Sequence, residues 1–172
     1  LIDAAKDAGA DAVKFQTFCA ERLVTRHSRK AAYQERNTGS RETQFQMLKD
    51  LELGEAALRH LYDYCAKKRA VFLSSAFDEY SADFLEELSV PMFKVPSGEL
   101  TNHPFLSYLA LKKKPLLVST GMATMTEIKD ALEIVFAAGN NKVTLLHCVT
   151  DYPVPIEQIN LKAIESLHNA FH

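Results

Sequence analysis

Five short apolar runs constrain the fold of this chain more than any other feature. They occupy residues 13–17, 71–75, 92–95, 116–121 and 143–147, and a Lys, Gln, Ser, Thr or His stands in or directly after each run. Segments with apolar residues at helical spacing separate them. Short apolar strands that alternate with helices indicate a parallel sheet covered by helices, which is either a doubly wound sheet or a (β/α)8 barrel.

The helices between these runs have recognisable ends. Gly9 is expected to end a first helix, and Asp78 to cap a helix that ends near Leu88. Thr124 and Glu127 match the capping box that starts a helix. The remaining helices are predicted at residues 42–51, 54–68, 103–111 and 159–171.

A barrel fits this pattern better than a nucleotide-binding sheet. Neither a GxGxxG nor a GxxxxGK[ST] loop follows any of the runs. A complete (β/α)8 barrel takes roughly 250 residues, whereas this chain has 172 and supplies five strands. We therefore predict one partial barrel domain over residues 1–172, lacking one strand before Leu1 and two after His172.

Polar side chains at the strand ends are the candidate site, because ligands of parallel α/β folds bind at the carboxyl ends of strands. Lys94 interrupts an apolar strand, and Glu99 follows the Pro-Ser-Gly turn after it. A buried cation is costly unless an anion pairs with it. That anion is Glu99, another side chain or a bound ligand, and this stretch alone does not decide between them.

Composition excludes several classes of protein. Hydrophobic residues make up 47% and charged residues 24% of the chain, as in a globular domain. The net charge of −2 gives no reason to expect nucleic acid. No apolar run reaches the roughly 20 residues of a membrane span, and no signal peptide is recognisable. The chain starts at Leu1 within an apparent helix, so we expect its true N-terminus to be missing.

The cysteines, Cys19, Cys65 and Cys148, are odd in number and form no CxxC pattern. Free thiols in a reducing compartment are expected, which favours a cytoplasmic protein. Cys148 follows His147 at a strand end. A catalytic thiol is conceivable there, although a small buried residue lining the site is the simpler interpretation.

Residues 19–50 interrupt the alternation of strands and helices. Cations crowd into this segment, among them Arg22, Arg26, Arg29, Lys30, Arg36 and Arg41. We interpret it as a solvated loop closed by the helix at 42–51. The alternative is a lid that brings cations near an anionic substrate.

The series of motifs resembles the sialic acid synthases, the family of N-acetylneuraminate synthase and its legionaminate and pseudaminate relatives. The matching segments, which follow one another in the family's order, are 9–17, 93–102, 119–123, 146–148 with 152–153, and 160–161. The resemblance implies a (β/α)8 barrel that condenses phosphoenolpyruvate with an N-acyl hexosamine such as N-acetylmannosamine. The product would be a nine-carbon 2-keto sugar acid, with phosphate released.

The resemblance also implies roles for individual residues. Glu99 would lie beside the reacting carbons, and Gln16 and Tyr152 would face the sugar. Phosphoenolpyruvate would contact Lys14, Ser75, Lys94, Ser97, Ser119 and Thr150. Two lysines and several hydroxyl groups suit a ligand with about three negative charges.

The family resemblance further implies a divalent metal, Mn2+ or Mg2+, and a homodimer. The family's metal-binding histidines lie on strands beyond this chain, so no metal ligand is predicted within it. Its N-terminal strand and the C-terminal antifreeze-like domain of many bacterial members are also absent from the sequence. We therefore expect these 172 residues alone to be inactive. In place of the Ser-Thr-Pro-Phe of many members, the chain has Ser-Ser-Ala-Phe at 74–77.

Two alternatives stay open. A lysine at a barrel strand end also suits a Schiff-base aldolase that uses Lys94 or Lys14. An incomplete barrel with unpaired strand edges near residues 13–15 and 143–146 is alternatively an inactive remnant that pairs with other chains.

Overall fold

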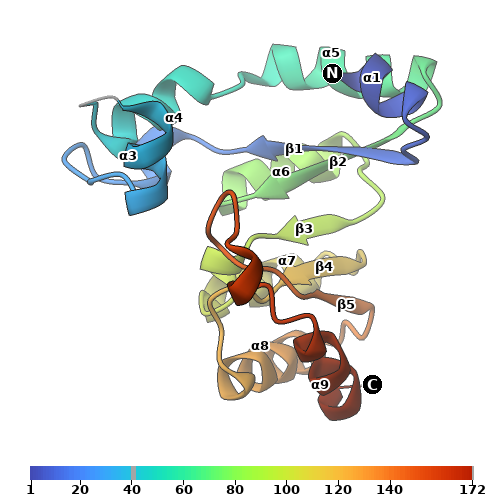
Figure 1. Cartoon of the computed structure of the whole chain (residues 1–172). Helices are drawn as coiled ribbons and strands as arrows, with labels where there is room; N and C mark the ends of the chain where they lie inside the picture. The colour runs from blue at the N-terminus through green and yellow to red at the C-terminus, as the bar shows by residue number, and fades with distance from the viewer. Residues whose placement is uncertain (40–41, 172) are drawn as a thin grey trace.

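The computed structural model describes residues 1–39 and 42–171 and contains one five-stranded parallel sheet within them (Figure 1). The strands are β1 Ala12–Thr17, β2 Val71–Ala76, β3 Phe93–Val95, β4 Leu116–Ser119 and β5 Val143–Leu146. They lie side by side in chain order, and every neighbouring pair is parallel. A doubly wound sheet reverses its strand order, so the partial (β/α)8 barrel is confirmed. The predicted open edges are confirmed as β1 and β5.

Helices connect the strands and cover one side of the sheet (Figure 1). They are α1 Ile2–Asp7, α2 Ala20–Leu23, α3 Ala32–Thr38, α4 Gln44–Leu51, α5 Glu55–Lys67, α6 Glu79–Glu87, α7 His103–Leu111, α8 Met125–Ala137 and α9 Lys162–Phe171. None of those helices is both long and apolar enough to cross a membrane.

The predicted caps are confirmed. The Asp78 side chain accepts a hydrogen bond from the Ser81 amide at the start of α6. Thr124 and Glu127 form the capping box of α8. Gly9 follows α1 with a φ of 85°, the left-handed conformation that glycine adopts without steric cost.

Two sequence-based expectations need correction. Residues 19–50 do not form a plain loop, because α2 and α3 precede the predicted helix α4. The last helix begins at Lys162 rather than near Ile159, after a short 3-10 turn at Ile156–Gln158. Within the segment 19–50, Arg41 lies outside the described residues.

The two faces of the sheet carry different side chains. Phe93, Val95, Leu116 and Val118 belong to the hydrophobic core, in which α5 to α8 pack on the outer face. Because side chains alternate along a strand, the residues between them point to the opposite, inner face. Lys94 lies there, so β3 carries core residues on one face and a lysine on the inner face of the barrel piece.

Candidate active site

One row of the inner face brings three predicted residues together across neighbouring strands. Gln16 on β1 pairs in register with Ser75 on β2, and Ser75 pairs with Lys94 on β3. The row continues to Leu117 on β4, which pairs with Lys94. Side chains two residues apart on a strand point to the same face. Lys14, two residues before Gln16, and Ser119, two residues after Leu117, therefore also lie on this face. The strand alternation therefore gathers a set of cationic, amide and hydroxyl groups.

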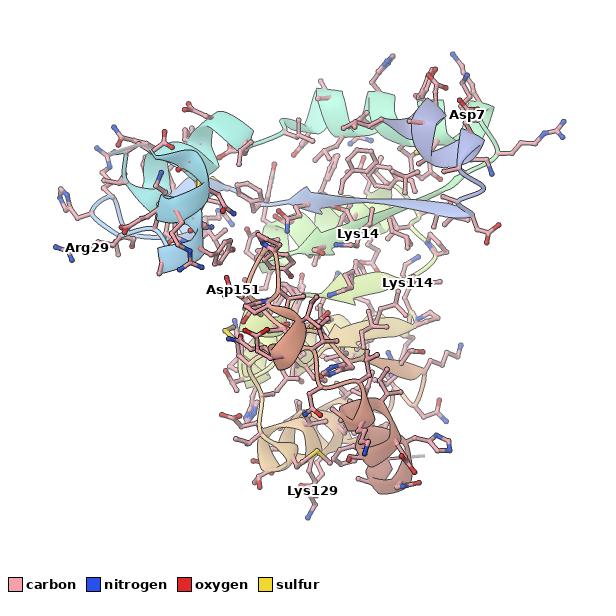
Figure 2. All side chains as sticks on the ribbon, in the orientation of Figure 1. Asp7, Lys14, Arg29, Lys114, Lys129 and Asp151 are labelled. Atoms are coloured by element: carbon pink, nitrogen blue, oxygen red, sulfur yellow. The ribbon has the colours of Figure 1, made fainter. Side chains whose placement is uncertain are left out.

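Lys94 is the most constrained of these groups. Its residue is only 7% exposed, and its ammonium donates a hydrogen bond to the Val95 carbonyl at 2.6 Å. Burial, and to a smaller extent the nearby positive charge of Lys14, lower the pKa of Lys94 to about 8, against a smaller opposing effect of Cys148. Figure 2 marks Lys14 on β1 and Asp151 in the loop after β5, on the side that the helices leave open.

The Lys94–Glu99 ion pair that the sequence left open is not formed. Glu99 instead accepts a hydrogen bond from the Asn102 side-chain amide at 2.8 Å, and Asn102 caps α7. No carboxylate pairs with Lys94 among the described residues. A buried ammonium without an anion is costly, so this face is suited to an anionic ligand.

Gly121 joins the segments that follow three strands. Its amide donates a hydrogen bond to the Ser97 hydroxyl at 3.1 Å, and that hydroxyl lies 3.3 Å from the Cys148 thiol. A Cβ at Gly121 would lie 2.9 Å from Cys148 Sγ and 3.0 Å from both Ser97 Oγ and Thr150 Cγ2. Only glycine allows this close approach, which places Thr150 beside Ser97.

Tyr152 lies at the edge of this site and contacts α3. Its carbonyl accepts a hydrogen bond from the Asn37 side-chain amide at 2.7 Å, and its ring lies 5.7 Å from the Tyr33 ring. Arg36 and Asp151 form a weaker exposed pair at 3.5 Å. The segment that the sequence described as a solvated loop therefore contacts the loop after β5.

The sequence reasoning missed Tyr33, Asn37 and Gly121. The first two are separated from Tyr152 by more than a hundred residues and have no local pattern that signals the contact. Gly121 stands within the Ser-Thr-Gly segment at 119–121. Its position directly after a strand was the available signal.

The described residues offer one group of possible metal ligands, Cys19, Glu21 and Glu52, whose ligand atoms lie within 4.8 Å of one another. Lys49 already binds both carboxylates, at 3.1 Å for Glu21 and 3.2 Å for Glu52. Because the Lys49 ammonium already neutralises part of the negative charge that a divalent ion would need, this group does not fit the metal that the resemblance implies. His147 contacts the Ile159 carbonyl at 2.7 Å through Nε2.

The cysteines differ in burial, since Cys65 is buried whereas Cys19 and Cys148 are half-buried. All three are free thiols. Cys65 is buried in the hydrophobic core, where burial raises its pKa. Cys148 packs against Gly121 and Ser97.

Comparison with known proteins gives a consistent result. The NeuB family profile matches residues 1–172. The N,N'-diacetyllegionaminic acid synthase of Campylobacter jejuni is 44% identical over 173 residues, which cover 99% of this chain and 52% of that protein. Human N-acetylneuraminate-9-phosphate synthase is 33% identical over 171 residues, covering 99% of this chain and 47% of that protein.

A solved structure agrees with these relatives. The N-acetylneuraminic acid synthetase of Leptospira borgpetersenii, crystallised with citrate, superposes with a TM-score of 0.83 at 28% identity, over 99% of this chain and 54% of that one. The chain thus spans about half the length of the proteins it matches. With the profile match over its whole length, the chain belongs to the NeuB family, the sialic acid synthase family that its motifs resemble.

Proposed function

We propose that the protein containing this chain condenses phosphoenolpyruvate with an N-acyl hexosamine, releasing phosphate and forming a nine-carbon 2-keto sugar acid. The observation that carries this proposal is Lys94, a buried ammonium on the inner face without a carboxylate partner among the described residues. Membership of the NeuB family supports it, as do relatives named as legionaminic and pseudaminic acid synthases.

In this proposal the anion is held from several strand ends. Lys14 and Lys94 supply positive charge, and the hydroxyl groups of Ser75, Ser97, Ser119 and Thr150 donate hydrogen bonds to the carboxylate and phosphate oxygens. Lys94 gains an anionic partner on binding, which raises its pKa back toward the ordinary value. A buried cation that is unpaired before binding is therefore a strong determinant of anion affinity.

The proposed reaction forms one carbon–carbon bond. Carbon 3 of phosphoenolpyruvate attacks the aldehyde carbon of the open-chain sugar, whose oxygen takes up a proton. The cation that develops at carbon 2 takes a water molecule, which loses one proton and becomes a hydroxyl. The C–O bond to phosphate then breaks as the hydroxyl passes its proton to the departing phosphate, which leaves the keto group. Glu99, oriented by Asn102, would stabilise that cation or move a proton, while Gln16 and Tyr152 would contact the sugar.

The finer parts of this proposal rest on the family resemblance. These are the Mn2+ or Mg2+ requirement, the homodimer, the cytoplasmic location and the choice of N-acetylmannosamine over a diacetamido sugar or a 6-phosphate. The inactivity of residues 1–172 alone also stays a prediction.

The test of the reaction is phosphate release by the protein containing this chain, incubated with phosphoenolpyruvate, Mn2+ and one amino sugar at a time. We expect release that depends on the sugar and yields a 2-keto acid containing all carbons of both substrates. Phosphate release without the sugar, or a product that lacks the sugar carbons, contradicts the proposal.

A Schiff-base aldolase is the second candidate, and one observation favours it. The lowered pKa of Lys94 supplies the neutral amine that such chemistry needs, a feature that the sequence did not reveal. Borohydride reduction in the presence of pyruvate separates the two candidates. An aldolase gains the mass of a reduced pyruvate adduct at Lys94, whereas we expect no adduct.

A further inference from the structure

Helix α3 is too short and too exposed to be stable on its own. It has seven residues, and none of them is buried. Isolated helices shorter than about 12–15 residues are marginal in water, so contacts outside the helix must stabilise α3. Those contacts occur at its C-terminal end and along the side that meets the loop after β5.

Lys30 provides the contact at the C-terminal end. Its side chain is 1% exposed, although it belongs to the most polar segment of the chain. The ammonium donates hydrogen bonds to Thr38 Oγ1 at 2.8 Å and to Glu42 Oε1 at 3.1 Å. Thr38 is the last residue of α3, and its hydroxyl donates to the Gln34 carbonyl one turn earlier. A cation at this end of a helix also interacts favourably with the helix dipole.

The residues of α3 then fix the loop after β5. Asn37 precedes Thr38 and donates to the Tyr152 carbonyl, and Tyr33 packs on the Tyr152 ring. Both the contacts to Tyr152 and the hydrogen bond from Lys30 are therefore made by residues of α3. If α3 frays at Thr38, Asn37 is the next residue to lose its position.

We propose that Lys30 is a positioning residue for Tyr152, acting through α3. Its buried ammonium orders the end of α3, and α3 holds the backbone and ring of Tyr152 at the edge of the site. That Tyr152 contacts an amino sugar rests on the proposed function. The coupling between Lys30 and Tyr152 does not.

The test compares Lys30→Met and Lys30→Arg with Lys49→Met. Lys49 is the matched control, since it is a lysine of the same segment in ion pairs with Glu21 and Glu52, and 46% of its side chain is exposed. Nuclear magnetic resonance of the chain follows two signals. The first is the Overhauser contact between the Tyr33 and Tyr152 rings. The second is the hydrogen exchange of two amides: that of Glu35, which donates to the Ala31 carbonyl at the start of α3, and that of Gly39, which donates to the Glu35 carbonyl at its end.

For Lys30→Met we expect loss of the ring contact and about tenfold faster exchange of both amides, while the amides of β3 and β4 keep their protection. Lys30→Arg keeps a cation and is expected to retain the ring contact, as is Lys49→Met. An unchanged ring contact in Lys30→Met overturns the inference. Where Lys30→Met does not fold, Thr38→Val removes the acceptor on α3, and retention of the ring contact in that variant overturns it instead.

Enzyme kinetics then separate this inference from the proposed function. In the protein containing this chain, Lys30→Met is expected to raise the KM for the amino sugar about tenfold and to leave the KM for phosphoenolpyruvate unchanged. An equal rise in both KM values overturns the positioning role. A wild-type protein that turns over neither substrate contradicts the proposed function, while the ring contact still decides the coupling.

Discussion

The outer and inner faces of the sheet use residues from the same strands, yet their side chains find partners in different ways. On β3, Phe93 and Val95 pack into the core and are fully buried. Lys94 between them is nearly as buried, but among the described residues it forms no ion pair. On the outer face the side chains of β3 pack against the chain's own core, whereas the charge of Lys94 on the inner face has no carboxylate partner among the described residues.

This difference indicates that β3 contributes to stability through its outer side chains and to binding through its inner side chain. Alternation along β3 places the two tasks on adjacent residues. Substitutions on the outer face should therefore change the free energy of unfolding, and those on the inner face should change ligand affinity. A β3 residue whose replacement lowers both the free energy of unfolding and ligand affinity breaks the comparison.

The largest expected effect on stability is that of Phe93→Ala. Removing this fully buried ring leaves a cavity in the core and should lower the free energy of unfolding by about 3–5 kcal/mol. Leu117→Ala on the inner face, where the leucine is only half-buried, is the control and should cost less. Urea unfolding measures both, and equal costs would mean that the faces do not differ.

A smaller effect is expected from Gly121→Ala. The added Cβ would lie 2.9–3.0 Å from side-chain atoms of Ser97, Cys148 and Thr150, and such overpacking costs about 1–3 kcal/mol. Because it displaces Ser97 and Thr150, phosphoenolpyruvate affinity should fall as well. Gly98→Ala meets no atom within 4 Å and serves as the control in calorimetric titration. Equal affinities for the two variants would exclude Ser97 and Thr150 from the anion site.

The smallest effect is a pH dependence. The pKa of Lys94 is lowered to about 8 by burial, so its charge is present below pH 8 and is lost above it. Phosphoenolpyruvate affinity should be constant below pH 8 and fall by up to about tenfold per pH unit above it. Titrations from pH 7 to pH 9.5 measure this slope, and Lys94→Met should lack it.

The free energy of unfolding is expected to change with pH in the opposite direction to phosphoenolpyruvate affinity. Between pH 8 and the ordinary lysine value of 10.5, the unfolded chain binds a proton that the folded chain does not, so the free energy of unfolding rises with pH. A fall of that free energy through this window, absent in Lys94→Met, would contradict the assigned pKa shift.

The strands and most helices could be predicted because their signals are local. The apolar residues 116–118 follow a proline and precede Ser119 and Thr120, and the structure has β4 at Leu116–Ser119. Helix α8 begins where Thr124 and Glu127 predict it. The strand predicted around Lys94 is confirmed as β3 at Phe93–Val95.

The parts that could not be predicted depend on distant contacts. Helix α3 buries no residue, so it has no apolar periodicity to detect. Asn37 meets Tyr152 because the segments that follow the two edge strands, β1 and β5, extend from the same end of the sheet (Figure 1). The position of Glu99 five residues after Lys94 made an ion pair between them conceivable from the sequence. In the structure, the turn at 96–99 directs the Glu99 carboxylate to Asn102 instead.

The central claim is that Lys94 is buried on the inner face for an anionic ligand, and one measurement tests it most directly. Calorimetric titration of the chain with phosphoenolpyruvate is compared with the same titration of Lys94→Met, whose fold is verified by urea unfolding. We predict binding by the wild-type chain, its loss in Lys94→Met, and a free energy of unfolding in the variant equal to or above that of the wild type. Equal binding by both proteins, or destabilisation of the variant without loss of binding, would contradict the account.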